Sequence, residues 1–291
     1  MSPDELELLR VLLQNIDNVL KNCVPLRDEV WPVGVGSSLA GDDAKASPYH
    51  LSHSVQHALQ VALDHLQCLR SALVAREEPD RISVTLPIHA GATLVRGALE
   101  NSARAIWLLA PAQRLERVRR RLALQADDHK QNRATAAVLT SSIAAYRSVD
   151  PDSLFQRTED EQKDQLVRLL LAAGWTSTGP KDTPQKALKW PTYAEVVREA
   201  GASLPQPTDS DRTVDMGKLL EYVWKTCSAL AHGDFTGSLS ILGKEIQAEY
   251  DGVSHVRLTG SVYHLQLGTS LACLSIITAL KLHEQRSRQL R

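Results

Sequence analysis

The stretch that decides the fold class is PIHAGATLVRGALENSARAIWLL, residues 87–109. Wound as a helix, it carries apolar residues around most of its circumference, and Pro111 marks its end. A helix that is apolar on most sides is buried among other elements rather than laid on a surface. The stretch therefore predicts a central helix of an all-α protein.

Apolar residues at helical spacing predict further helices on both sides of this one. The first opens at Ser2-Pro3-Asp4-Glu5, where serine is a good cap and the acids face the positive end of the helix dipole, and it should end near residues 23–25. The others are expected at about 48–76, 111–148, 159–173, 191–200, 214–232 and 261–286. The pattern predicts a bundle of about seven or eight helices.

Three segments between these helices are predicted to be irregular. They are two long loops, 31–48 and 174–190, and a linker, 201–213. Residues 245–258 are predicted to form a small β-hairpin around Asp251-Gly252, with a helix followed by a loop as the alternative. Because only two long elements follow the linker, we expect residues 1–291 to form a single helical domain.

The composition limits the classes of function. With a net charge of −1, the chain has no overall positive field to recruit nucleic acid or an anionic membrane, although a local basic patch remains an option. The four cysteines form no CxxC pair, which indicates buried thiols. We expect no signal peptide, no transmembrane helix and a cytoplasmic location.

Motifs that mark common cofactor and metal sites are missing. The sequence has no GxGxxG after a strand, no GxxxxGK[ST], no GxSxG and no HExxH. His53 and His57 have a spacing that can hold a metal, and His50 is close by, but a solvated helix face is the simpler interpretation. We therefore expect no cofactor and no metal.

A local basic cluster follows Pro111. It consists of Arg114, Arg117 and the run Arg119-Arg120-Arg121. Such runs are usually solvated helix faces, and contact with a phosphate backbone is the alternative.

The first concentrated polar feature is at the end of the helix expected at 214–232. Lys225, Ser228 and His232 lie at positions i, i+3 and i+7, so they share one stripe, and Gly233 breaks the helix. A histidine in a last helical turn can cap the final carbonyls. The alternative is that His232 is a general acid or base, or a ligand contact, at the rim of the bundle.

The second feature is a stripe of charge on the central helix. Arg96, Glu100 and Arg104 are spaced i, i+4 and i+8, and His89, Asn101 and Trp107 are further polar or aromatic residues of this helix. Because the rest of the helix is apolar, the stripe should be half-buried. It is either a structural ion network or a site for an anionic group such as a phosphate or carboxylate.

Tyr222, Ser228 and His232-Gly233, together with Arg96-x-x-x-Glu100, resemble uncharacterised actinobacterial helical proteins and are similar to the HEPN superfamily. That resemblance implies a helical bundle with an Arg-x(4–6)-His motif on a late helix, often at a dimer interface. Active members are metal-independent ribonucleases of toxin–antitoxin and phage-defence systems, and inactive members bind nucleic acids or nucleotides.

The resemblance implies that His232 is the catalytic histidine and that Lys225 stands where the family has arginine. Tyr222 and Ser228 are then supporting contacts, and a homodimer is expected. The lysine is a departure from the motif, because it keeps the charge but lacks the two-pronged guanidinium that grips a phosphate.

Two other functions remain open at this stage. One is a protein that binds a small anionic ligand, or an unusual helical enzyme, whose site lies between the helices at 87–109 and 214–232. Arg96, Glu100, Arg104 and His232 would line that site, with loop 31–48 as a lid. The other is a scaffold or antitoxin-like partner without chemistry.

Overall fold

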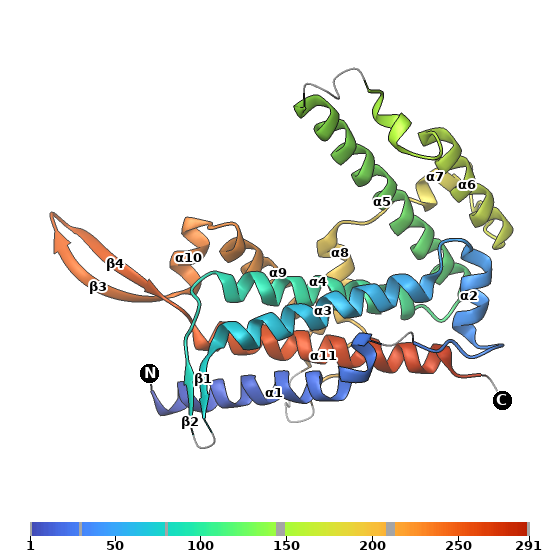
Figure 1. Cartoon of the computed structure of the whole chain (residues 1–291). Coiled ribbons are helices and arrows are strands. Elements are labelled where there is room, and N and C mark those ends of the chain that lie inside the picture. The colour runs from blue at the N-terminus through green and yellow to red at the C-terminus, as the bar shows by residue number, and fades with distance from the viewer. Residues whose placement is uncertain (1, 29–30, 79–80, 144–148, 208–212, 290–291) are drawn as a thin grey trace. The chain divides into compact units, whose positions relative to one another are not determined.

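The computed structural model describes residues 2–28, 31–78, 81–143, 149–207 and 213–289 (Figure 1). Over these residues the α-helices are α1 (Pro3–Asp28), α2 (Ser38–Ala46), α3 (Leu51–Leu73), α4 (Ala90–Leu109), α5 (Arg114–Ser142), α6 (Glu159–Ala172), α7 (Pro184–Ala187), α8 (Tyr193–Gly201), α9 (Met216–Ala231), α10 (Phe235–Ile241) and α11 (Val262–Ser287). Two antiparallel hairpins pair β1 (Val74–Glu78) with β2 (Arg81–Val84) and β3 (Gly243–Tyr250) with β4 (Val253–Thr259). The prediction of a mainly α-helical fold is confirmed.

The chain forms two compact units, each assembled from separate segments. Unit 1 contains Met1–Trp31, Val55–Trp107 and Tyr193–Glu284, and unit 2 contains Pro32–Ser54, Leu108–Thr192 and Gln285–Arg291. Whether the whole chain folds as the single domain expected from the sequence stays a prediction.

Unit 1 is built around the long helices α1, α3, α4, α9 and α11 (Figure 1). Each buries one apolar stripe in a common core, represented by Leu12, Ile16, Leu59, Leu66, Leu99, Ile106, Leu220 and Ile276, all of them fully buried. The side-chain amide of Asn15 on α1 donates to the Ser270 hydroxyl on α11 at 3.2 Å. A Cβ atom on Gly268 of α11 would lie 2.9 Å from Val95 on α4, so the absence of a side chain lets these helices cross closely.

Helices α8 and α9 of unit 1 cross with their backbones close together. A Cβ atom added to Gly217 would lie 2.8 Å from the backbone oxygen of Arg198, and one added to Gly201 would lie 2.7 Å from the backbone oxygen of Met216. Since both obstacles are backbone atoms, no side-chain rotation relieves them.

We expect Gly217→Ala to destabilise unit 1. Overpacking of this kind costs roughly 1–3 kcal/mol, which exceeds the gain in helix propensity of at most about 1 kcal/mol. Urea unfolding followed by circular dichroism measures the change. Gly179→Ala is the matched control, because nothing lies within 4 Å of its added Cβ atom. Equal unfolding midpoints for the two variants would show that the α8–α9 crossing is looser than described.

Unit 2 packs α2, α6 and α7 around the first half of α5. Its core consists of Ala46, Val118, Leu122, Leu166, Leu170 and Leu188. A buried ion pair joins α2 to α5: Asp42 is 0% exposed and Arg117 is 1% exposed. The Arg117 guanidinium donates through Nε and Nη2 to the two carboxylate oxygens at 2.7 and 2.9 Å, so the pair is bidentate.

The predicted number of helices is too low, because three short helices were not predicted, two of them in segments expected to be irregular. The predicted loop 31–48 contains α2, which the Ser37 side chain caps by accepting from the Ala40 amide, and the predicted loop 174–190 contains α7, capped by Thr183. The third, α10, is capped by Asp234. Each has too few turns to show a clear apolar period. The predicted linker 201–213 begins with Gly201, the last residue of α8. Its residues 208–212 lie outside the described residues.

The hairpin predicted near 245–258 is confirmed as β3–β4, with Asp251 and Gly252 at positive φ in its turn. The second hairpin, β1–β2, corrects the prediction that one helix runs from 48 to 76. That helix ends at Leu73, and Val74–Glu78 pairs with Arg81–Val84 instead. The last residues of the helix predicted at 111–148 (144–148) lie outside the described residues.

One helix bears on the expectation that the chain has no membrane span. Among the described residues, α11 alone is long and apolar enough to cross a bilayer by length and composition. The core helix of a globular protein passes the same test, and α11 buries Leu271, Ala272, Ile276 and Ala279. The absence of a membrane partner stays a prediction.

Candidate functional site

The C-terminal end of α9 presents His232 at the surface. Residue 232 is the C-cap: its backbone N–H donates to the Ser228 oxygen at 3.0 Å, and Gly233 continues at φ +67°, a conformation that favours glycine. The imidazole is exposed, and its Nε2 faces Arg96 on α4. Capping is therefore done by the backbone, and the side chain is left for another contact.

That contact is with Arg96 on α4. Nη1 of Arg96 lies 3.1 Å from Nε2 of His232. A guanidinium only donates hydrogen bonds, so Nε2 is the acceptor, and the imidazole in this arrangement is neutral with its proton on Nδ1. A cation and an unprotonated ring nitrogen thus face the same patch of surface.

Glu100 and Trp224 hold Arg96 in place. Oε1 of Glu100 accepts from Nε of Arg96 at 2.8 Å and from Nε1 of Trp224 at 2.8 Å. The Arg96 guanidinium also lies over the Trp224 ring, 5.7 Å from its centroid. Arg96 and Glu100 side chains are 27% and 20% exposed. In the part of the chain that the structure describes, Nη2 of Arg96 has no hydrogen-bond partner, so it is available to an anion.

A second histidine reaches the same helix end. Nδ1 of His89, the residue before α4, lies 3.1 Å from the Leu230 backbone oxygen. Because the oxygen accepts, Nδ1 carries a proton, which leaves Nε2 for another contact. Sequence reasoning placed His89 on this helix but not in the site. The available signal was its spacing of seven residues from Arg96, which puts both on one helical face.

The other residues proposed from the sequence do not reach His232. Nζ of Lys225 pairs with Glu221 at 2.7 Å, and the Ser228 hydroxyl donates to the Trp224 backbone oxygen at 2.9 Å. The Tyr222 side chain is exposed. Arg104 donates through Nη2 to the Tyr193 hydroxyl on α8 at 2.6 Å and lies over its ring. Of the two arginines in the stripe of charge on α4, Arg96 therefore contacts His232 on α9 and Arg104 contacts Tyr193 on α8.

The local basic cluster of α5 is not a solvated face. Arg117 and Arg121 are buried, and Arg119 and Arg120 both donate to Glu116 at 2.7 Å. Burial raises the pKa of Glu116, but hydrogen bonds from these two arginines outweigh it and leave the pKa below its ordinary value. These four arginines are buried or form hydrogen bonds within unit 2, which removes the support for a phosphate-backbone contact there.

His50, just before α3, and His53 on α3 lie close together. His50 and His53 have ring centroids 4.8 Å apart, yet no group of three histidine, cysteine, aspartate or glutamate side chains that could hold a metal is present among the described residues.

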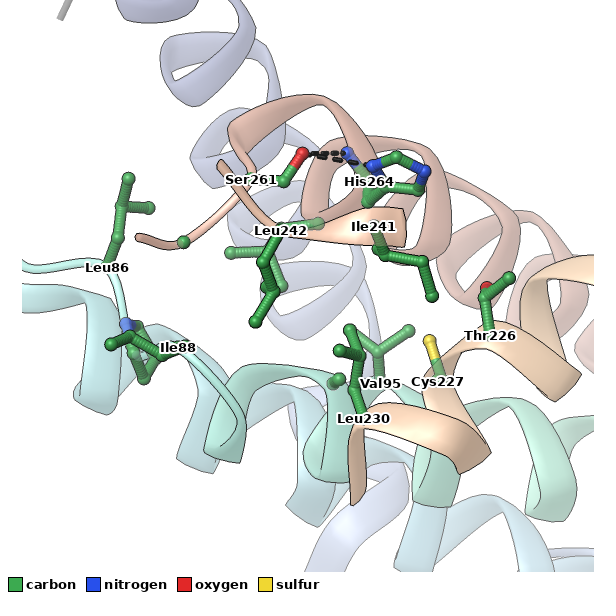
Figure 2. A pocket seen from close by; sticks show the side chains of 14 residues that line it. Leu86, Ile88, Val95, Thr226, Cys227, Leu230, Ile241, Leu242, Ser261 and His264 are labelled. Atoms are coloured by element: carbon green, nitrogen blue, oxygen red, sulfur yellow. Dashed lines mark hydrogen bonds between the residues drawn. The ribbon is translucent and has the colours of Figure 1, made fainter. Parts of the chain in front are cut away.

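The cavity between α4, α9 and α11 is apolar (Figure 2). It measures about 30 Å³, room for a water molecule or two but not for an organic ligand. Its lining includes Val95, Cys227 and Leu230, and Ser261 and His264 meet at its edge with Oγ 3.0 Å from Nδ1. Arg96, Glu100, Arg104 and His232 are not part of that lining, so the enclosed anion pocket expected between these helices is not formed there.

The candidate site is therefore the exposed His232 together with the half-buried Arg96 and His89, with Glu100 and Trp224 in contact with Arg96. Comparison of the chain with protein-family models, with curated proteins and with solved structures finds no significant match. Its function is argued from this geometry.

Proposed function

We propose that this site binds the phosphodiester backbone of RNA and cleaves it without a metal ion, as a HEPN-like ribonuclease. The observation that carries the proposal is the 3.1 Å contact between Arg96 Nη1 and His232 Nε2 at an exposed helix end. It combines a fixed cation for a phosphate with a neutral imidazole for proton transfer, which are the two groups that metal-free cleavage of RNA requires.

The reaction follows from the donors and acceptors. A phosphate oxygen takes the two Nη groups of Arg96, which releases Nε2 of His232 to accept the proton of the ribose 2′-hydroxyl. The 2′-oxygen attacks phosphorus, and Arg96 stabilises the charge that develops on the phosphate oxygens. The bond from phosphorus to the 5′-oxygen breaks as protonated His89 gives its Nε2 proton to that oxygen. The products are a 2′,3′-cyclic phosphate and a 5′-hydroxyl.

This assignment moves the phosphate-binding role from Lys225 to Arg96. The guanidinium that the family motif has on the histidine's own helix comes here from α4, and Glu100 orients it. Two histidines of one chain supply both proton transfers, so the chemistry does not require a second copy. The homodimer, a toxin or defence role and the cytoplasmic location remain proposals.

His232→Ala is expected to lower the rate of cleavage of single-stranded RNA in EDTA by about 10²–10⁴-fold, the usual contribution of a general acid or base. Gel electrophoresis gives the rate, and mass spectrometry identifies the cyclic phosphate ends. His255→Ala is the matched control, because this exposed histidine lies on β4. Cleavage that survives in His232→Ala, or RNA left intact by the unaltered protein, would overturn the catalytic assignment. If the protein then bound intact RNA, and this binding depended on Arg96, only the phosphate-binding part of the proposal would stand.

A further inference from the structure

Exposed aromatic side chains are confined to one stretch of the sequence. Over the residues that the structure describes, they are Tyr222, Phe235, Tyr250 and Tyr263, which are between 53% and 73% exposed. The same stretch contains His232, and the other described aromatic side chains are buried or half-buried. Single exposed apolar residues are ordinary on a protein surface. Exposed rings gathered around a proposed phosphate site point instead to nucleobases, whose flat π faces stack on aromatic side chains.

Phe235 is the exposed ring nearest to His232 along the chain. The two residues are three positions apart, so their Cα atoms lie at most about 11 Å from each other. Gly233 turns the chain between them with φ +67°, and α10 begins at Phe235 itself. One or two nucleotides of a single strand span this distance. A base can therefore lie on Phe235 while a neighbouring phosphate contacts Arg96 beside His232.

The first turn of α10 is held against α9, which fixes the backbone of Phe235. The Asp234 N–H donates to the Ala229 backbone oxygen at 2.9 Å, and Oδ1 of Asp234 accepts from the Gly237 N–H at 2.6 Å. A Cβ atom added to Gly237 would lie 2.9 Å from that of Ala229, so α10 touches α9 there. At its other end α10 lines the apolar cavity through Ile241 (Figure 2). The ring of Phe235 is 73% exposed and thus remains open to a ligand.

We infer that Phe235 is a platform on which a base of single-stranded RNA stacks, next to the phosphate that Arg96 binds. This inference rests on the ribonuclease function proposed above and names the substrate class of that site. Neighbouring bases cover both faces of each base inside a duplex, so the nucleotide that stacks on the ring is an unpaired one. A phenyl ring has no hydrogen-bonding group, so it accepts any of the four bases.

Fluorescence anisotropy of the full chain with labelled 2′-O-methyl strands tests the inference, because these strands lack the 2′-hydroxyl and cannot be cleaved. The two probes are an oligouridine and the same backbone without its bases. The unaltered protein is expected to bind the oligouridine roughly tenfold more tightly than the base-free strand, a typical contribution of one stacked base. With cleavable RNA, a stem–loop is expected to be cut in its loop, and cuts in the stem would contradict the inference.

Substitutions of Phe235 locate the stacking. Phe235→Ala is expected to bind both strands with the Kd of the base-free strand, and Phe235→Trp is expected to keep the preference for bases. Phe235→Leu keeps an apolar side chain without a ring and is expected to lose most of that preference. Tyr250→Ala is the matched control, because this ring is 67% exposed but lies at the far end of β3, about 23 Å from its start. A preference for bases that persists in Phe235→Ala would overturn the inference.

Binding and cleavage are measured separately, so the two proposals can fail separately. If RNA stays intact but the preference for bases depends on Phe235, the ribonuclease falls and the stacking platform stands. If His232-dependent cleavage is observed but the unaltered protein binds both strands alike, the platform alone falls. Absence of binding to either strand would overturn both. Size-exclusion chromatography with light scattering tests a protein partner: a dimer that Phe235→Ala dissociates, with the preference for bases unchanged, would make Phe235 a protein contact and overturn the inference.

Discussion

Asp42→Ala is expected to lower the free energy of unfolding of unit 2 by about 3–5 kcal/mol, the cost of removing one partner from a buried ion pair. The substitution leaves the guanidinium of Arg117, which is 1% exposed, without its carboxylate. The remaining acceptors of Arg117 are neutral: the Ser38 hydroxyl at 2.7 Å and the backbone oxygens of Pro111 and Ala112 at 2.8 Å. They satisfy hydrogen bonds but not the charge.

Urea unfolding followed by circular dichroism, with limited proteolysis to identify which unit opens, measures this effect. Arg114→Gln is the matched control, because Arg114 also contacts Asp42, at 3.3 Å, but its side chain is 51% exposed. Such an exposed contact is worth about 1 kcal/mol or less. Replacing both charges, as in Asp42→Leu with Arg117→Met, should cost less than Asp42→Ala alone. A loss below about 1 kcal/mol in Asp42→Ala would mean that water reaches the pair.

Arg96→Ala is expected to reduce RNA cleavage by about 10²–10³-fold, the typical effect of removing one group that stabilises a developing oxyanion. Lys225→Ala is expected to leave the rate nearly unchanged, because that ammonium pairs with Glu221 and does not touch His232. The comparison of these two variants decides whether Arg96 or Lys225 binds the phosphate beside His232. The motif of the resembling family favours Lys225, and the contact at 3.1 Å favours Arg96.

Arg96→Lys sharpens the same comparison. Lysine keeps the charge but cannot bond Glu100 and His232 at the same time through a planar fork, so only partial activity is expected. Single-turnover rates, measured with the protein in excess over the RNA and well above the Kd, separate a loss of chemistry from a loss of binding. Full loss in Lys225→Ala with none in Arg96→Ala would reverse the assignment.

Local sequence signals predicted the long helices closely and the short elements poorly. The helix predicted at 214–232 is Met216–Ala231, because the Asp215 cap and Gly233 mark its two ends. By contrast, α2 buries only Leu39, Asp42 and Ala46, too few residues to reveal a period. The β1–β2 hairpin was missed because Val74–Glu78 continues directly from a helix and exposes most of its side chains.

In the candidate site, local sequence signals also fail to predict which residues from distant segments come into contact. The sequence places Arg96, Glu100 and Arg104 on one face of a helix, but Arg96 and Arg104 are eight residues apart, or about 12 Å along the axis. One imidazole cannot meet both. Which of them meets His232 depends on where α9 crosses α4, and that crossing is set by packing between segments more than a hundred residues apart.

The division of the chain into units has a consequence for its biogenesis. A ribosome makes α1, α3 and α4 before most of unit 2, yet the unit they belong to also needs α8, α9 and α11, which follow most of unit 2 in the chain. The intervening residues of unit 2 must leave the exit tunnel while those earlier apolar faces are still uncovered. We expect chaperones to shield those faces until α11 has emerged. Messages broken upstream of the codons for α11 are expected to yield fragments that proteases remove.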